Sequence, residues 1–458
     1  MKPHGCFINN ENVILSTDLY QLTMSAAYYQ YNLDNNINEE SDDIATFELF
    51  VRKLPKNRNY LIFTGLEQVI HYLQNAHFSD RTIDYLRSNE MFKNIDSKFF
   101  DDYLPNFRFD IDIWAMKEGT FFFPNEPILR VTGPSIQSQL IETYIISVIN
   151  YQTIVASKAS RIRNVAKDKL LLEFGTRRAH SPQAGIYAAR ASYIGGFDGT
   201  SNVVSDLELG IEASGTMAHS FIQKFGEMKS FEVFYEYFED KTIDLIDTYD
   251  IKEGTLKAAK FGNKILGVRI DSGDLAEETK RVRRLLDENG CEEVKIVLSS
   301  NLDEYLIKEI LDKQAPADAF GVGTELVTSS DDPTLSAVYK LMDYNGHPKI
   351  KISEGKVTYP GKKQVYRFFD EKGKFEKDLI ALDDEKVEDR GVPLLIPIME
   401  KGELVYDLPT LEEIREYSLK NVNKLPNSYL KLEQIKHIDL EISNNLNELW
   451  ESLKNKYE

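Results

Sequence analysis

Four charged or hydroxyl side chains follow the apolar run ILGV abruptly, in the motif GVRIDSGDL. They are Arg269, Asp271, Ser272 and Asp274. Carboxylates at such a place can hold ribose hydroxyls or Mg²⁺, and Arg269 can pair with a carboxylate substrate. The segment from Asp271 to Asp274 can also cap the helix that follows, because Ser-Gly-Asp is an ordinary helix start. We expect the cap, but it does not account for Arg269.

Two consecutive arginines, Arg177 and Arg178, stand in the motif EFGTRRAHSPQAG between an expected strand and an expected helix. Their planar donors suit phosphate or pyrophosphate, and the N-terminus of the helix adds a partial positive charge. An isolated pair of arginines more often belongs to a surface salt bridge. The place at a strand end favours binding.

A histidine between hydroxyl residues, His219, occurs in the run GTMAHS together with Thr216. It can be a general base, a phosphate contact or a nucleophile that accepts a phosphoryl group. A lone histidine is more often structural, and the spacing alone leaves these roles open. The loop GGFDGTSNVV, which contains Ser201, lets a small ligand approach the backbone, although an ordinary turn has the same composition.

Two further runs, SSNLDE and FGVGT, end expected strands late in the chain. They offer hydroxyls and open backbone N–H groups at Ser299, Ser300, Gly321, Gly323 and Thr324. A barrel seats a terminal phosphate on its last strands with such groups. The position of these runs after all the other motifs favours that role.

Short apolar strands that end in small or polar residues must position these side chains. They are LLLEFG, IDLIDTYD, ILGVRIDSGD, VKIVLSSN and DAFGVGT. Strands that alternate with helices indicate parallel βαβ units, and this number of units favours a barrel over an open sheet. The sequence therefore predicts an α/β protein whose site lies at the carboxyl ends of barrel strands.

Three parts are expected along the 458-residue chain: an N-terminal α+β domain over residues 1–136, an irregular α/β barrel over 137–341, and C-terminal strands and helices over 342–458. The last part either returns to the first domain or forms a small third one. We expect an amphipathic helix over residues 16–30 and a long helical stretch over 138–166 that breaks near Asn150. Charged helices are expected over 411–420 and 438–453.

Composition narrows the classes of partner. With 74 acidic and 55 basic residues the formal net charge is −19, and the sequence has no long basic stripe, so nucleic acid is not an expected partner.

Cys6 and Cys291 lie far apart in sequence and outside any CxxC pattern, so the cysteines indicate neither a disulfide framework nor a zinc site. Residues 1–18 lack the apolar core of a signal peptide and no apolar run reaches the ~18 residues of a membrane span. We expect a soluble cytoplasmic protein that does not bind membranes.

Eight motifs, taken in order, resemble the nicotinate phosphoribosyltransferase family. They are STDLYQLTM, FELFVRKLP, EFGTRRAHSP, GGFDGTSNV, GTMAHSF, GVRIDSGDL, SSNLDE and FGVGTELVTS. The resemblance implies a type II phosphoribosyltransferase fold, an irregular α/β barrel packed against an N-terminal α+β domain, in a homodimer with shared active sites. It also implies an ATP-coupled ligase that joins nicotinate to phosphoribosyl pyrophosphate, the first step of NAD synthesis from nicotinate. Nicotinate mononucleotide, pyrophosphate, ADP and phosphate are the products.

The resemblance also assigns roles. Tyr20 would line the nicotinate ring from the neighbouring subunit, Thr216 and Arg269 would bind the nicotinate carboxylate, and Arg177 would contribute to the ring and phosphoribosyl site. Thr324 in the GVGT run would hold the 5-phosphate, and ATP would phosphorylate His219. Asp271 would stabilise the oxocarbenium-like state at the anomeric carbon and help to hold Mg²⁺ on the pyrophosphate. Further substrate contacts are expected from Arg178, Ser201, Ser272, Ser299, Gly321 and Gly323.

Other functions remain open at this point. Nicotinamide phosphoribosyltransferase is the near rival, but that relative carries an aspartate at the position of Ser201, and an aspartate would repel a carboxylate substrate. Quinolinate phosphoribosyltransferase would call for a more basic ring pocket. A non-catalytic barrel that senses a phosphorylated sugar or nucleotide would be free to lose Arg269, Asp271 and His219. An aldolase or isomerase would normally supply a strand-end lysine or glutamate base, and no persuasive Schiff-base lysine is present.

Overall fold

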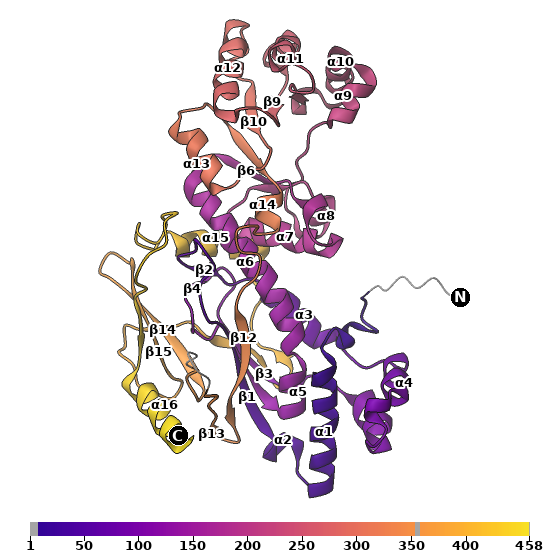
Figure 1. Ribbon diagram of the computed structural model, residues 1–458, viewed down its shortest axis with the longest axis vertical. Helices are drawn as coiled ribbons and strands as arrows, with labels where there is room; N and C mark the ends of the chain where they lie inside the picture. The colour runs from indigo at the N-terminus through magenta and orange to yellow at the C-terminus, as the bar shows by residue number, and fades with distance from the viewer. Residues whose placement is uncertain (1–7, 353–357, 458) are drawn as a thin grey trace.

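The computed structural model describes residues 8–352 and 358–457 of the chain. Figure 1 shows an elongated molecule in which a parallel sheet and its helices occupy one end and antiparallel sheets occupy the other. Helix α6 (Glu142–Ala166) runs between the two ends. No helix in the described ranges is both long and apolar enough to cross a bilayer.

A seven-stranded antiparallel sheet forms the N-terminal end, in the order β13-β12-β1-β5-β3-β17-β18. Its strands are β1 (Ile44–Val51), β3 (Asp112–Ala115), β5 (Leu129–Pro134), β12 (Ala337–Tyr344), β13 (His347–Pro348), β17 (Ile396–Glu400) and β18 (Glu403–Leu404). A two-stranded sheet of β2 (Leu61–Ile62) and β4 (Phe121–Phe122) accompanies it. The late strands β12, β13, β17 and β18 flank the early strands on both sides of this sheet.

Helices pack around this antiparallel sheet. They are α1 (Leu19–Asn35), α2 (Glu39–Asp42), α3 (Leu66–Asn75), α4 (Asp80–Ser88) and α5 (Ser135–Leu140). The expected amphipathic helix over residues 16–30 corresponds to α1, which buries Leu22 and Ala26 on one side and exposes Tyr20 on the other. Apolar residues at helical spacing thus form the buried face, as expected.

A six-stranded parallel sheet forms the other end, in the order β7-β6-β11-β10-β9-β8. Its strands are β6 (Leu170–Glu173), β7 (Gly199–Thr200), β8 (Ile243–Leu245), β9 (Gly267–Ile270), β10 (Lys295–Leu298) and β11 (Ala319–Val322). The helices that alternate with them are α7 (Pro182–Ile194), α8 (Val203–Leu209), α9 (His219–Phe225), α10 (Glu227–Phe238), α11 (Ile251–Ala258), α12 (Leu275–Glu288), α13 (Glu304–Asp312) and α14 (Thr324–Val327). This is the expected irregular barrel, and within the described residues the terminal strands β7 and β8 do not pair.

A four-stranded sheet, β16-β14-β15-β19, and two helices complete the chain. They are β14 (Lys363–Phe369), β15 (Phe375–Leu382), β16 (Val392–Pro393), β19 (Leu440–Ile442), α15 (Leu411–Val422) and α16 (Asn444–Tyr457). The division at residues 136 and 341 stays a prediction.

Two expectations about helices are wrong. Helix α6 continues through Asn150 without a break. The Asn150 side chain accepts a hydrogen bond from the Leu335 amide at 2.6 Å, so it has a tertiary partner and does not compete for the helix backbone. The segment expected as a helix from residue 438 begins with the strand β19, which pairs in parallel with residues 378–380 of β15. In both places a tertiary partner outweighs local propensity.

Candidate active site

A pocket of about 360 Å³ opens at the carboxyl ends of β6 and β7, beside β9. It brings together four side chains that the sequence predicted in four separate motifs. The lining consists of Phe174, Thr176, Arg177, Ser201, Ser214, Gly215, Thr216, Met217, Ala218 and Arg269. One aromatic ring, two guanidinium groups and several hydroxyls therefore share one small cavity.

Arg269 lies within β9 and is half-buried at this pocket. Burial lowers the pKa of its guanidinium, the charges of Asp271 and Asp247 raise it, and the nearby Arg177 lowers it. The Nε atom is buried and has no hydrogen-bond partner among the described residues. A bound carboxylate would compensate a desolvated cation of this kind.

Phe174 lines the pocket because β11 leaves room for its ring. A Cβ on Gly321 would lie 2.3 Å from Cδ2 of Phe174, and a Cβ on Gly323 would lie 3.1 Å from the Phe174 carbonyl oxygen. The Phe174 amide in turn donates to the carbonyl of Val322 at 2.8 Å. Gly321 is buried inside β11, so its missing side chain accounts for the position of the aromatic wall.

The ends of β6 and β7 are joined by Glu173. This fully buried carboxylate accepts hydrogen bonds from the Thr200 hydroxyl, at 2.6 Å, and from the Gly175 amide. Burial raises the pKa of Glu173, and these two donors lower it. The Glu173 carbonyl also accepts from the Ser201 amide at 2.8 Å, so Glu173 fixes where Ser201 meets the pocket.

A chain of polar contacts joins the ends of β8, β9 and β10 to α9. The carboxylate of Asp271 accepts from the Ser299 hydroxyl at 2.5 Å, and its other oxygen lies 3.8 Å from His219 Nε2. The Nδ1 atom of His219 lies 3.1 Å from the Thr248 hydroxyl. Asp247 accepts from the Ser272 hydroxyl at 2.6 Å and from the Asp271 amide at 2.9 Å. These contacts connect four of the predicted residues into one group: His219, Asp271, Ser272 and Ser299.

Asp274 takes the structural role that its motif allows. Its carboxylate accepts from the amides of Ala276, at 3.1 Å, and Glu277, at 3.2 Å, and so caps α12. The expected helix cap is confirmed, and Arg269 and Asp271 lie outside it.

Three of the predicted residues that carry side chains lie neither in the pocket lining nor in the connected group around Asp271. Arg178 is exposed beside Arg177, and Thr324 is the first residue of α14. Tyr20 is exposed on α1, where its hydroxyl lies 3.3 Å from Glu142 Oε2; burial and the charge of Glu142 raise its pKa to about 12. Within one chain, Tyr20 does not reach the pocket.

The sequence motifs did not predict several residues of the site, some in the pocket lining and some beside Asp271 and His219. Phe174 and Thr176 belong to the EFGTRR motif but carry no charge, and Asp247 and Thr248 follow β8 in the run IDLIDTYD. The rule that strand ends carry function would have found Asp247 and Thr248. Nothing local marks Ser214 or Met217.

The chemistry of this group of side chains suits a metal that arrives with its substrate. In the described part of the chain, no three His, Cys, Asp or Glu side chains are arranged as a metal site. Among the residues that the structure describes, none donates a hydrogen bond to the buried Oδ1 of Asp247, next to Asp271. Mg²⁺ commonly binds through one or two carboxylates together with substrate phosphates and water, so these residues fit it.

Family models match nearly the whole chain. The N-terminal domain of nicotinate phosphoribosyltransferase matches residues 15–150, the family's main domain matches residues 170–376, and its C-terminal domain matches residues 389–450. A nicotinate phosphoribosyltransferase of Mycobacterium tuberculosis is 41% identical over 427 residues, which cover 92% of this chain and 89% of the relative. That of Bacillus subtilis is 39% identical over 473 residues, covering 95% and 94%.

Solved structures agree with the sequence comparisons. The crystal structure of human nicotinic acid phosphoribosyltransferase superposes with a TM-score of 0.83 at 26% identity and covers 95% of this chain and 99% of its own. A nicotinate-nucleotide pyrophosphorylase from Pyrococcus furiosus superposes with a TM-score of 0.74 at 30% identity and covers 93% and 99%. With its motifs in order, its barrel site and these relatives, the chain belongs to the nicotinate phosphoribosyltransferase family.

Proposed function

We propose that this enzyme transfers the phosphoribosyl group of phosphoribosyl pyrophosphate to the ring nitrogen of nicotinate, giving nicotinate mononucleotide and pyrophosphate in the first step of NAD synthesis from nicotinate. The observation that carries the proposal is Arg269, a half-buried cation in a small pocket with the aromatic wall of Phe174; its Nε has no hydrogen-bond partner among the described residues. A flat aromatic acid provides a carboxylate for the cation and a ring for Phe174.

The pocket chemistry favours the acid over the amide. Arg269 and Thr216 would bind the nicotinate carboxylate, with Ser201 as a neutral hydroxyl beside it. Arg177 adds a second positive charge at the cavity. Two cations and no carboxylate in the lining support nicotinate over nicotinamide.

The phosphoribosyl group would extend from this pocket toward Asp271. Displacement at the anomeric carbon builds positive charge on the ribose, which the Asp271 carboxylate would stabilise. Ser299 holds that carboxylate in place through its hydroxyl. Asp271 and Asp247 would hold Mg²⁺ with the pyrophosphate, and the metal would neutralise charge on the leaving group. We place the 5-phosphate near Gly323 and Thr324 and keep Arg178 and Ser272 as further candidates for phosphate contacts.

His219 would couple ATP to the transfer. Its ring is partly exposed and lies between Thr248 and Asp271, at the side of the site where the pyrophosphate would leave. Phosphorylation would change the charge there and favour product formation.

A second copy of the chain would complete the site. Tyr20 lies outside its own pocket and exposes its ring, which suits a homodimer in which Tyr20 lines the nicotinate ring of the partner. We place the enzyme in the cytoplasm, where a reducing environment suits the free, buried thiol of Cys291.

The decisive experiment incubates the purified enzyme with radiolabelled nicotinate or nicotinamide, phosphoribosyl pyrophosphate and Mg²⁺, with and without ATP. We expect labelled nicotinate mononucleotide and a stimulation by ATP. Preference for nicotinamide, or no nucleotide from either base, would contradict the proposal.

A further inference from the structure

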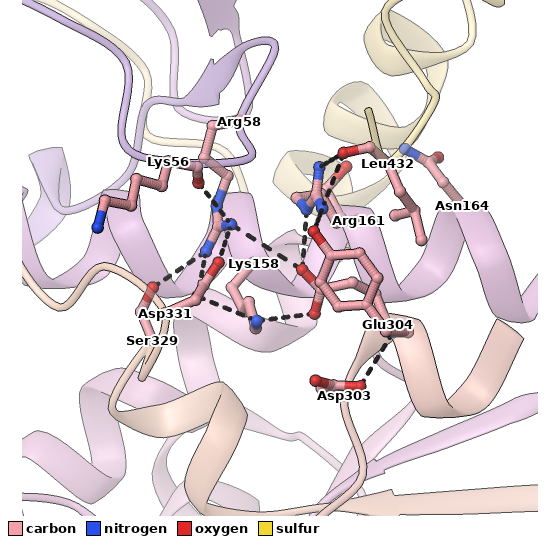
Figure 2. A network of polar contacts seen from close by, with 12 residues as sticks. Lys56, Arg58, Lys158, Arg161, Asn164, Asp303, Glu304, Ser329, Asp331 and Leu432 are labelled. Atoms are coloured by element: carbon pink, nitrogen blue, oxygen red, sulfur yellow. Dashed lines mark hydrogen bonds and ion pairs between the residues drawn. The ribbon is translucent and has the colours of Figure 1, made fainter. Parts of the chain in front are cut away.

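Three cations are buried together where the N-terminal part of the chain meets the barrel. Arg58 comes from the loop between β1 and β2, and Lys158 and Arg161 lie one turn apart on α6. We call these three residues the cation cluster. Figure 2 shows that they face two carboxylates, Glu304 at the start of α13 and Asp331 in the segment after α14. The cluster thus joins segments that are far apart in sequence.

Glu304 connects the cluster to the loop after β10. Its carboxylate is fully buried and lies 2.7 Å from Lys158 Nζ and 2.9 Å from Arg161 Nε. Glu304 is the first residue of α13, so these ion pairs fix where the preceding loop must end. That loop begins at Ser299, whose hydroxyl donates to Asp271.

The same loop has a backbone that needs support. Ser300 and Asn301 have φ values of +93° and +47°, which lie in the left-handed region that residues other than glycine seldom adopt. Such a conformation persists only where the surroundings hold it. Asp303 caps α13 by accepting from the amides of Tyr305 and Leu306, and Glu304 ties the helix start to the cluster. The loop that begins at Ser299 is therefore fixed at its far end by Asp303 and Glu304, and at its near end by the hydrogen bond from Ser299 to Asp271.

Asp331 connects the cluster to the segment that follows β11 and α14. Its two oxygens lie 2.7 and 3.0 Å from the two terminal nitrogens of Arg58, and Lys158 Nζ lies 3.0 Å away. Arg58 also donates to the Ser329 hydroxyl at 3.1 Å. Arg58 thus holds residues 329–331 through a planar, bidentate contact.

Hydrogen bonds between residues close in sequence connect this segment to Thr324. The Thr324 carbonyl accepts from the Thr328 amide, at 3.1 Å, and from the Thr328 hydroxyl, at 2.7 Å. The Ser329 amide donates to the Leu326 carbonyl at 3.1 Å. The segment from Thr324 to Asp331 therefore consists of α14 and the hydrogen-bonded turn after it, and Arg58 anchors its far end.

The cation cluster contains three cations, and they face two carboxylates whose pKa values they lower. Burial raises the pKa of Glu304, but Lys158 and Arg161 lower it more, and the net shift is downward. Burial likewise raises the pKa of Asp331, and Arg58 and Lys158 lower it below its usual range. Both carboxylates are thus ionised, and one positive charge stays in excess. Buried ion pairs are weak stabilisers compared with apolar packing but specify one arrangement of their segments.

We propose that the cation cluster positions the loops 299–304 and 324–331 for the phosphoribosyl substrate, with Glu304 and Asp331 as positioning residues. One cluster sets both loops, because Lys158 contacts Glu304 and Asp331 together. This inference rests on the proposed function, in which Ser299 supports Asp271 and Thr324 lies at the 5-phosphate.

The first test is the variant Asp331→Asn, because the Asp331 side chain is 20% exposed and the substitution keeps its size. We expect the KM for phosphoribosyl pyrophosphate to rise about tenfold, since small displacements of positioning groups have effects of this size or larger. The KM for nicotinate should stay within about twofold, because Arg269 and Phe174 lie outside the two loops.

A matched control is Lys363→Met. Lys363 is another buried lysine, 2.8 Å from a buried carboxylate, Glu48, but it lies on β14, away from both loops. We expect this variant to melt at a lower temperature with an unchanged KM for phosphoribosyl pyrophosphate. A purely structural role for the cluster would make Asp331→Asn behave in the same way.

A second variant and a second measurement cover the risk that a charge deletion prevents folding. Arg58→Lys keeps the charge but loses the bidentate contact, so it should also raise the KM for phosphoribosyl pyrophosphate. In the wild-type enzyme, hydrogen exchange of residues 299–304 and 324–331 should slow when phosphoribosyl pyrophosphate binds. Unchanged KM values in both folded variants, an equal rise of both substrates' KM values, or unchanged exchange in both loops would overturn the inference. Absence of transfer by the wild-type enzyme would instead refute the proposed function.

Discussion

Oδ2 of Asp271 lies 3.8 Å from Nε2 of His219. The two residues come from different strand-end motifs, and their contact joins the candidate phosphoryl acceptor to the carboxylate that is expected beneath the ribose. The distance is too long for a direct hydrogen bond and short enough for each charge to affect the other. A change of charge on His219 would therefore act directly on Asp271.

His219→Ala should abolish the stimulation by ATP while slow basal transfer remains. The phosphoryl acceptor is lost, but Arg269 and Asp271 are left in place. The measurements are the initial rate with and without ATP and acid-labile phosphate on the protein. The control is His77→Ala, because His77 is an exposed histidine in the N-terminal part of the chain. This variant should keep the full stimulation by ATP. Wild-type stimulation in His219→Ala would refute the coupling role.

Arg269→Lys should raise the KM for nicotinate by about 10-fold to 100-fold, because lysine cannot replace a planar, bidentate contact. Arg178→Lys tests whether the two arginines exchange roles. Because Arg178 lies outside the pocket lining, we expect its nicotinate KM to change by less than about twofold. Steady-state kinetics with varied nicotinate compare the two variants. A larger rise of the nicotinate KM in Arg178→Lys than in Arg269→Lys would assign the carboxylate contact to Arg178.

Ser201→Asp should shift the enzyme toward nicotinamide. The new carboxylate would repel the nicotinate carboxylate and accept from an amide N–H, so the ratio of kcat/KM for nicotinamide to that for nicotinate should rise at least about tenfold. Ser201→Asn separates charge from size, since it is neutral and similar in volume to aspartate. An equal shift in both variants would mean that size, not charge, sets the preference.

Gly321→Ala should displace the aromatic wall of the pocket. The added methyl would lie 2.3 Å from the Phe174 ring, and overpacking of a buried site costs about 1–3 kcal/mol. We expect a lower melting temperature and a higher nicotinate KM. At Gly215 an added methyl meets nothing within 4 Å, so Gly215→Ala should keep the wild-type melting temperature. Equal stability of all three proteins would contradict this account of Gly321.

Asp244→Asn should change how stability depends on pH. Asp244 is fully buried in β8, both carboxylate oxygens lack hydrogen-bond partners among the described residues, and burial raises its pKa from 3.8 to about 8. The folded protein thus holds a proton that the unfolded chain releases near 3.8, and the stability from this group is lost as pH rises toward 8.

The variant lacks this titration, so its stability relative to the wild type should increase between pH 4 and pH 8, by at most about 1.4 kcal/mol per pH unit. Melting temperatures of both proteins across this range provide the measurement. A constant difference between them would show that Asp244 does not titrate there.

Much of the site was predictable because chemistry-bearing residues cluster where apolar strands end. Arg269 and Asp271 follow the run ILGV, and the structure places both at the site. Phe174 was missed because an aromatic residue next to a strand usually belongs to the core. The break expected at Asn150 was wrong because the partner of its side chain, the Leu335 amide, is distant in sequence.

The sequence by itself determined five of the six strands of the parallel sheet and the residues at their ends, because strand periodicity and strand-end polarity are local properties. It missed β7, which lies in the expected loop GGFDGTSNVV, because two residues are too few to show a strand pattern. Only the tertiary structure decided which ends meet. β6 lies between β7 and β11, so Phe174 contacts Gly321 although almost 150 positions separate them. The same holds for the cation cluster, where Arg58 meets Asp331. Contacts of this kind depend on chain topology and packing, which no local pattern records.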